Sequence, residues 1–190
     1  MLSRLLVACL ALGLVAPAAA DPRQDLRKAY VSNLALKSYK ATMIDMASNK
    51  TLSTIEFQAP DRYRVAAGGQ APSVIVGDTM YLNAGGQSIK VPLPKDTLGQ
   101  LRNDKTISDL EKNISVESAG AGAVGGQPAR KYRFRSSTAD QESSSTVWIG
   151  AASGHVLQVE TSGKHGGKPY AMRMVYSDCN SPAIRINAPK

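Results

Sequence analysis

The sequence predicts an α+β fold: a large curved antiparallel sheet, forming a half-open β-barrel, that is covered by an N-terminal helix and short inserted helices. The clearest evidence is the stretch Thr51–Pro94, where apolar and polar residues alternate with a period of two between turn residues. Further alternating runs lie between residues 113 and 187, and a helical pattern precedes the first strand. Together these runs amount to roughly ten strands, and a sheet of that size tends to curl.

The stretch Thr51–Pro94 is predicted to be an antiparallel meander with one apolar face. Apolar residues recur at every second position, as in Ile55 and Phe57 and again in Tyr63 and Val65. Glycine tolerates a positive φ, and proline fixes φ without donating a hydrogen bond, so both favour turns. Such residues separate the runs at Ala59-Pro60-Asp61, Gly68-Gly69, Gly77-Asp78 and Gly85-Gly86.

An amphipathic helix is predicted over Pro22–Leu36. Asp21 suits the N-cap, because its carboxylate can accept a hydrogen bond from the first turn, and proline is favoured at the first helical position. The apolar residues Leu26, Ala29, Tyr30 and Leu34 follow at helical spacing. This stripe is expected to pack on the sheet.

Two short helices are predicted after the meander, where Pro92 and Pro94 end the sheet pattern. Leu98 and Leu101 belong to the first helix, which Asp96 would cap; Ile107 and Leu110 belong to the second, which Asp104 or Thr106 would cap. Gly99 and the Asn103-Asp104 break weaken this helical insertion, which suits a segment that moves.

The remaining strands are assigned from the same alternation. Ser38–Ser48 has two mixed faces, which favours either an edge strand or a strand whose faces are both partly covered. The loop Ser118–Pro128, rich in Gly and Ala, is compatible with a mobile connection and with a tight bulged hairpin. The other expected elements are strands at Asn113–Glu117, Ala129–Ser136, Ser143–Ile149, His155–Ser162 and Tyr170–Ser177, a loop at Gly163–Pro169, and a run at Ala183–Asn187 that would close the sheet.

Residues 1–20 have the features of a secretory signal peptide. Arg4 precedes an apolar run that is too short to span a bilayer, and Ala18-Ala19-Ala20 ends it. We expect cleavage after Ala20, a periplasmic location, and a single domain over residues 21–190. Cys9 would leave with the signal, although Leu6–Cys9 also resembles a lipidation box. Cys179 would then be the one remaining thiol, and its surroundings favour an inert one.

The chain is basic, with 23 Lys and Arg against 15 Asp and Glu and a net charge of +8. A basic surface suits nucleic acid, an anionic membrane or an acidic partner. Export argues against nucleic acid, and the positive residues are scattered without a run of five. Transient contact with an anionic membrane surface is therefore expected, and no nucleic-acid partner.

The sequence offers little support for catalysis. His155 lies at a predicted hairpin and His165 in a Gly/Lys loop, so the two histidines have different settings. The chain has no His-x-x-x-His, no Cys pair and no Gly-x-Ser-x-Gly elbow, and the Gly120–Gly126 loop lacks the Lys-Ser/Thr of a phosphate loop. We expect no catalytic residues, no metal, no cofactor and no enzymatic activity.

Several motifs resemble the LolA/LolB-like lipoprotein-carrier superfamily. Phe57–Val65 matches its strand with Phe followed by Pro and an Arg-aromatic-Arg strand, and Val74–Leu82 matches the next hairpin. Val147–Ile149 with Ser153–Glu160 matches its late hairpin. The resemblance implies an open curved sheet lidded by helices over an apolar cavity, and a periplasmic carrier or sensor for acyl chains. The aromatic content of 5% and the strong positive charge depart from a lipoprotein carrier and favour generic lipid binding.

An acyl chain needs a continuous apolar surface, and burial of each CH₂ contributes about 0.8 kcal/mol. Methionine is frequent among the residues expected to face inward, and its flexible side chain suits a surface that repacks around different ligands. The same residues could instead form a closed core with no cavity. The inward candidates are Met43, Phe57, Tyr63, Val65, Met80, Leu82, Ile89, Val91, Val147, Ile149, Leu157, Val159, Met172 and Met174.

Arg62 and Arg64 are candidates to anchor a head group or the lid, with outward, solvated charges as the alternative. In the superfamily, the arginine of this strand hydrogen-bonds to the lid, so the resemblance implies that role for one of them. The predicted lid consists of Pro22–Leu36 and Pro94–Lys112.

The function predicted from these features is a periplasmic carrier that binds the acyl chains of lipids or lipoproteins for transfer across the envelope. Membrane-bound donor and acceptor proteins are its expected partners. Two alternatives stay open: a lipid-sensing regulatory module acting on an envelope protein, and a structural envelope protein with a filled core.

Overall fold

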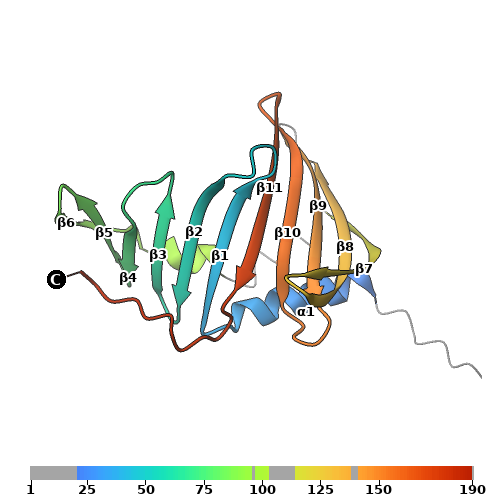
Figure 1. The fold of residues 1–190 in the computed structure, drawn as a ribbon, viewed down its shortest axis with the longest axis horizontal. Coiled ribbons are helices and arrows are strands. Elements are labelled where there is room, and N and C mark those ends of the chain that lie inside the picture. Colours follow the sequence, from blue (N-terminus) through green and yellow to red (C-terminus); the bar gives the residue numbers. More distant parts are fainter. Residues whose placement is uncertain (1–20, 96, 103–113, 138–140, 190) are drawn as a thin grey trace, which may run out of the picture.

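The computed structural model describes residues 21–95, 97–102, 114–137 and 141–189. Two helices and one antiparallel sheet make up this part of the chain (Figure 1), which confirms the predicted fold class. The elements in order are α1 (Pro22–Leu34), β1 (Ser38–Asp45), β2 (Thr51–Gln58), β3 (Arg62–Ala67), β4 (Ser73–Val76), β5 (Thr79–Ala84), β6 (Gln87–Pro92), α2 (Thr97–Leu101), β7 (Ser115–Val124), β8 (Gln127–Ser137), β9 (Gln141–Gly150), β10 (Val156–His165) and β11 (Lys168–Ser177).

The sheet consists of two meanders that meet in the middle. Its strand order is β6-β5-β4-β3-β2-β1-β11-β10-β9-β8-β7, so each meander runs outward to one edge. The seam between them is the pairing of β1 with β11, in which Ala41 lies opposite Tyr176 and Met43 opposite Met174. The sheet is curved and unclosed, with β6 and β7 at its edges.

Helix α1 covers the meander formed by β7–β11, lying across the lower ends of β8–β11 in Figure 1. The Asp21 carboxylate accepts a hydrogen bond from the Arg23 backbone N–H at 3.0 Å, which confirms the predicted N-cap. The helix ends at Leu34, two residues earlier than predicted. Its buried residues pack into the main core, which contains Leu26, Ala29, Ile114, Tyr132, Phe134, Val147, Ile149 and Val156.

Polar contacts fix both ends of α1 on the sheet. Near its start, the Asp25 Oδ2 accepts hydrogen bonds from the Arg130 Nη1 at 2.8 Å and the Tyr132 hydroxyl at 2.6 Å. Near its end, the Asn33 Oδ1 accepts one from the Val156 backbone N–H at 2.9 Å. The helix is therefore held in one orientation over β8–β10.

The meander predicted over Thr51–Pro94 is confirmed as β2–β6, but β1 differs from the edge alternative, because it lies at the centre of the sheet. The Ser118–Pro128 stretch forms the bulged hairpin alternative. Strand β7 continues to Val124 through a bulge between Ser118 and Ala121, which contains Gly120 at a φ of 83°.

Two predictions at the C-terminal end, one of a loop and one of a closing strand, were wrong. Gly163–Pro169 is mostly strand: β10 and β11 continue until His165 pairs with Lys168, and only Gly166-Gly167 forms the turn. Both glycines have positive φ, as a two-residue hairpin turn requires. The Ala183–Asn187 run forms no strand within the described residues and does not close the sheet.

The C-terminal segment crosses the sheet instead of joining it. In Figure 1 it runs from β11 past the lower ends of β1, β2 and β3 toward the C-terminus. Asp178 and Asn180 have positive φ, which ends the strand pattern. Ile186 is fully buried, its N–H donates to the Gln58 Oε1 at 2.7 Å, and its carbonyl accepts from Arg62 at 2.8 Å. This segment therefore braces the β2–β3 side of the molecule.

The first predicted short helix is confirmed as α2. Its proposed cap Asp96, the second short helix with its caps Asp104 or Thr106, and residues 103–112 of the predicted lid lie outside the described residues, as does the predicted signal peptide over residues 1–20. Among the described helices, none combines the length and apolarity that crossing a bilayer would take.

Candidate functional site

The pairing registers decide which predicted cavity residues share a face of the sheet. Residues directly opposite each other in an antiparallel pair point to the same face. Phe57 lies opposite Tyr63, and Met80 lies opposite Val91. Continued across all strands, the registers place on one face the predicted residues Met43, Phe57, Tyr63, Val65, Met80, Leu82, Ile89, Val91, Val147, Ile149, Val159, Met172 and Met174.

Leu157 is the exception among these candidates. A register shift between Val156 and Gln158 interrupts the alternation in β10. The Leu157 side chain lies beside Gly150, where its Cδ1 is 3.3 Å from the position that a Cβ would take. Because Gly150 follows the inward-facing Ile149, Leu157 points to the outer face.

The inner face is filled at one end and open at the other. Val147 and Ile149 are 0% and 1% exposed, because Leu26 and Ala29 of α1 pack on them. Ile89 and Val91 on β6 are 50% and 36% exposed. The same apolar face is therefore a closed core under α1 and an accessible surface toward β6.

A row of aromatic rings joins these two regions. Tyr176 of β11 packs edge-on against Tyr39 of β1, with ring centroids 5.6 Å apart. Tyr39 contacts Phe57, and Phe57 contacts Tyr63, each with centroids 5.1 Å apart. Burial raises the pKa of Tyr63 to about 12, while the Arg102 guanidinium acts in the opposite direction.

Arg102, just after α2, is the polar residue at the centre of this row. Its guanidinium carbon lies 3.8 Å from the Phe57 ring centroid and 5.3 Å from that of Tyr39, which is cation–π geometry. Its Nη2 donates to the Asn33 carbonyl at 3.1 Å and to the Leu34 carbonyl at 2.7 Å. Arg102 therefore caps the C-terminus of α1 and connects both helices to the sheet.

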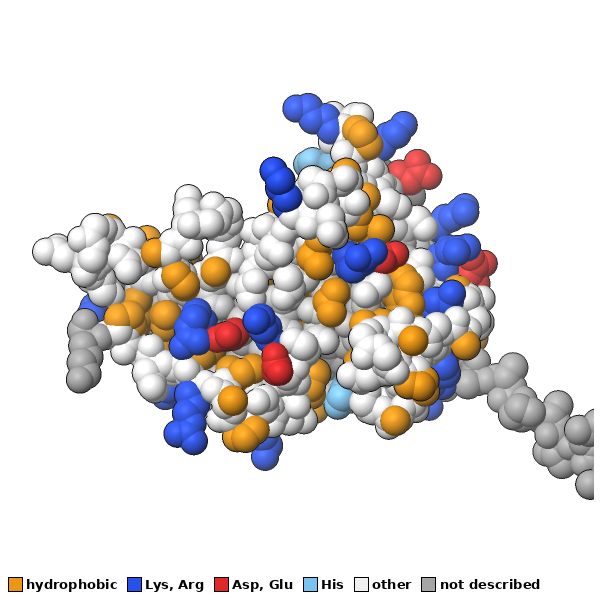
Figure 2. All heavy atoms as spheres, in the orientation of Figure 1, with side chains coloured by type: hydrophobic (Ala, Val, Ile, Leu, Met, Phe, Trp, Pro, Cys, Tyr) orange, Lys and Arg blue, Asp and Glu red, His pale blue; other side chains and the backbone are white. Residues whose placement is uncertain are grey.

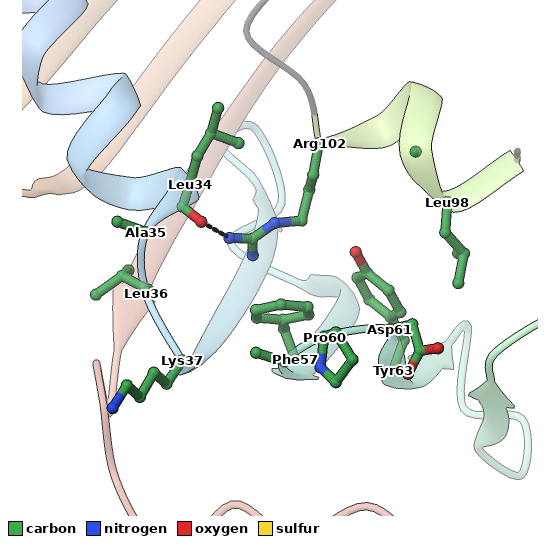
Figure 3. Close-up of a pocket in the computed structure, with 12 residues that line it drawn as sticks. Leu34, Ala35, Leu36, Lys37, Phe57, Pro60, Asp61, Tyr63, Leu98 and Arg102 are labelled. Carbon is green, nitrogen blue, oxygen red and sulfur yellow. Dashed lines mark hydrogen bonds between the residues drawn. The ribbon is translucent and has the colours of Figure 1, made fainter.

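A pocket of about 390 Å³ opens beside Arg102 (Figure 3), between the end of α1, α2, and the turn from β2 to β3. In Figure 3 the Tyr63 hydroxyl points toward the side of α2, while the Lys37 ammonium points away from Arg102. The lining residues are Leu34, Ala35, Leu36, Lys37, Phe57, Ala59, Pro60, Asp61, Tyr63, Leu98, Gly99 and Arg102.

A second depression of about 740 Å³ borders the C-terminal segment. Its lining combines apolar residues, Pro60, Pro182 and Ile184 among them, with polar ones such as Ser38, Gln58 and Asn180. Aromatic rings, which form the floor of the Arg102 pocket, are not among the described residues that line it.

Arg62 and Arg64 lie on the face opposite Tyr63. Arg62 donates to the Ile186 carbonyl at 2.8 Å, and Arg64 pairs with Glu56 and donates to the Arg185 carbonyl at 3.1 Å. Both therefore hold the C-terminal segment, and their hydrogen bonds within the described residues do not reach α1 or α2. The contact between an arginine and the helical cover that the resemblance implied is made by Arg102 instead.

Sequence reasoning did not single out Arg102, Tyr39 or Leu98 as site residues. Nothing in the alternation around Tyr39 distinguishes it from its neighbours, and Arg102 is one of several cations in its segment. A cluster of three or more side chains suited to hold a metal ion does not occur within the described part of the chain.

Comparison with known proteins identifies the fold. No family model matches the chain, and no curated protein matches its sequence. Among solved structures, lipoprotein LppX of Mycobacterium tuberculosis is similar, with a TM-score of 0.63, 13% identity, and coverage of 87% of this chain and 97% of that one. LprF of Mycobacterium bovis has a TM-score of 0.63, 12% identity, and coverage of 88% and 96%.

The Pseudomonas aeruginosa MucA/MucB complex is also similar, with a TM-score of 0.50 and 14% identity over 83% of this chain and 58% of that one. At these identities the likeness concerns the fold alone. It agrees with the curved, unclosed sheet. The chain thus has the same fold as LppX and LprF.

Proposed function

We propose that this chain is an exported carrier that binds acyl chains of lipids or lipoproteins on the inner face of its sheet and transfers them across the envelope. The observation that carries the proposal is the contrast along this face, where Val147 is fully buried but Ile89 remains 50% exposed. An apolar surface left open beside a filled core favours an apolar ligand.

The chemistry of the open surface supports an acyl ligand. Each CH₂ taken from water contributes about 0.8 kcal/mol, and hydrocarbon needs no directed polar groups. Met43, Met80, Met172 and Met174 lie on this face and are all partly exposed. Their flexible side chains suit a surface that adapts to chains of different shape. The predicted cavity residues on this face, Leu157 excepted, are the proposed binding surface, with α1 and α2 as cover.

The comparisons support the same proposal at the level of the fold, since LppX is a lipoprotein by its description and has this architecture. They also support the proposed export, which the pattern of residues 1–20 predicts. We infer no enzymatic role. The spread of basic side chains among acidic ones in Figure 2 suits weak, transient contact with an anionic membrane surface.

A second candidate is a regulatory module that binds an envelope protein in response to lipid. The similarity to MucB, which was solved as a complex with MucA, favours it. In that case the acyl chain would control a protein-binding surface instead of being cargo.

Native mass spectrometry of protein purified gently from the periplasm tests both proposals. A co-purifying lipid supports them, and transfer of that lipid to acceptor vesicles supports the carrier over the regulatory module. A clean apo mass together with no uptake of a fluorescent fatty acid would leave the structural protein with a filled core.

A matched pair of variants tests which face binds. Met80 and Tyr81 are neighbours on β5 with opposite faces and intermediate exposure. Met80→Glu places a carboxylate on the proposed binding surface, so uptake of the fluorescent fatty acid should weaken by about tenfold or more. Tyr81→Glu should leave uptake unchanged. Equal effects of both variants would contradict the assignment of the inner face.

A further inference from the structure

Arg102 has hydrogen-bonding capacity that its contacts with the described residues do not use. Its Nη2 is occupied by the carbonyls of Asn33 and Leu34. Its Nε and Nη1 hydrogens have no partner among the residues that the structure describes. The guanidinium also lies over the Phe57 ring, with its carbon 3.8 Å from the ring centroid. A cation in such surroundings favours an anionic partner.

The Tyr63 hydroxyl is a second donor in the same pocket that the described residues leave without a partner. The residue is 7% exposed, and no hydrogen bond of its hydroxyl occurs within the described ranges. The hydroxyl points to the side on which α2 and Arg102 lie (Figure 3). Arg102 and Tyr63 therefore present a cation and a neutral donor above one aromatic floor.

Two other charged residues line the pocket, Lys37 and Asp61. The Lys37 ammonium points away from Arg102 in Figure 3. Asp61 is the acidic residue in the lining, and its Oδ2 lies 3.5 Å from the position of a Cβ on Gly77, at the turn after β4. Apolar walls are supplied by Leu34, Pro60 and Leu98.

From this geometry we propose that the Arg102 pocket is a head-group site that selects acyl ligands with an anionic oxygen, a carboxylate or a phosphate, over neutral lipids. This proposal rests on the proposed acyl binding and adds the class of ligand. The volume of about 390 Å³ is within the range of small-molecule sites. The contact from Phe57 to Tyr63 in the aromatic row leads from this pocket toward the open part of the inner face, where the acyl chain would lie.

The site also couples ligand binding to the helical cover. Nη1 can donate to an anionic oxygen while Nη2 keeps its bonds to α1. An anion that takes two parallel bonds from Nη1 and Nη2 must displace the Asn33 or the Leu34 carbonyl from Nη2. Head-group binding through both Nη1 and Nη2 would therefore weaken the contact between Arg102 and α1.

The test uses a matched pair of fluorescent probes, cis-parinaric acid and its methyl ester, titrated at neutral pH. Wild type should bind the acid at least about tenfold more tightly than the ester, because hydrogen bonds to charged groups are the stronger ones. Arg102→Gln should weaken binding of the acid roughly 10- to 100-fold and change binding of the ester little. Arg64→Gln, on the outer face, is the control and should keep the preference.

Tyr63→Phe keeps the proposal testable if Arg102 variants fail to fold, since it removes only the hydroxyl. It should reduce binding of the acid by roughly three- to tenfold and leave the ester unaffected. An acid-to-ester ratio that stays unchanged in Arg102→Gln, or in Tyr63→Phe, overturns the head-group site.

Two further comparisons distinguish failure of the head-group site from failure of acyl binding itself. Wild type that binds both probes equally would overturn the head-group site and leave acyl binding standing, whereas wild type that binds neither would overturn both. Acetate and inorganic phosphate should displace the acid only at concentrations far above that of the probe. Displacement by either at comparable concentration would assign the pocket to a free small anion and overturn the proposal.

Discussion

The two halves of the sheet have the same alternating sequence pattern but are packed differently. In the half formed by β7–β11, which we call the closed half, α1 covers the inner face and Val147, Ile149 and Val156 are almost completely buried. In the half formed by β2–β6, the open half, β6 is exposed along its whole length. The difference lies in the elements that pack on each half, because both contribute the same kind of side chains.

The open half is braced from the other side. The C-terminal segment crosses its outer face, with Ile186 fully buried and held by Gln58 and Arg62. An element placed there stabilises β2 and β3 without filling the inner face. A fold that keeps an apolar surface available needs such external support, since the stabilising burial cannot come from the surface itself.

The largest expected effect is a difference in the free energy of unfolding between alanine variants of one isoleucine in each half. Ile149→Ala should lower the free energy of unfolding by about 2–5 kcal/mol, because it leaves a cavity under α1. Ile89→Ala should cost only about 0.5 kcal/mol, because Ile89 is half exposed. Urea unfolding of both variants measures the difference. Equal losses would mean that the open half is packed as tightly as the closed half.

A smaller effect is expected from the contact that fixes α1 on the closed half. The Asp25 side chain is 10% exposed and accepts hydrogen bonds from Arg130 and Tyr132. Asp25→Asn removes the charge from both bonds, and we expect a loss of about 1–3 kcal/mol in the free energy of unfolding. Hydrogen exchange of α1 amides should increase in the same variant.

The control is Glu117→Gln, which breaks the ion pair with Arg133. Both of these side chains are at least half exposed, so a change of at most about 1 kcal/mol is expected. If Glu117→Gln lowers the free energy of unfolding as much as Asp25→Asn does, contact with α1 is not what makes the Asp25 interaction stabilising.

Local patterns were sufficient to predict most of the fold. The β2–β6 meander follows from glycine and proline turns between alternating residues, and the α1 cap follows from Asp21 and Pro22. The same period-two rule fails at Leu157, since a bulge in β10 moves this side chain to the outer face. A single extra residue in a strand is not visible in composition or spacing.

The contacts of the site could not be predicted, because they join residues far apart in the chain. Arg102 donates a hydrogen bond to the carbonyl of Leu34 in α1, which precedes it by 68 residues in the sequence. Ile186 is buried only because the C-terminal segment turns back across β2, with a separation of 128 to Gln58. Alternation did place Arg62 and Arg64 opposite Tyr63, but it could not say what they bind.

The smallest expected effect is a loss of stability at high pH, caused by ionisation of a tyrosine at the seam between the halves. It does not occur at neutral pH. Burial, together with neighbouring Tyr39, raises the pKa of Tyr176 to about 12, and burial also raises the pKa of Tyr30. A tyrosine of the unfolded chain titrates near pH 10. The neutral phenol therefore contributes stability that is fully present below about pH 10 and is lost as the pH rises toward 12.

We expect the free energy of unfolding to fall over this pH interval, measured by urea unfolding at several pH values together with tyrosinate absorbance. Tyr176→Phe cannot ionise at the seam, so its stability should decline less steeply than that of wild type. Tyr81→Phe, on the outer face of the open half and away from the aromatic row, should leave the slope unchanged. Identical slopes in wild type and Tyr176→Phe would mean that burial at the seam does not raise the pKa of Tyr176.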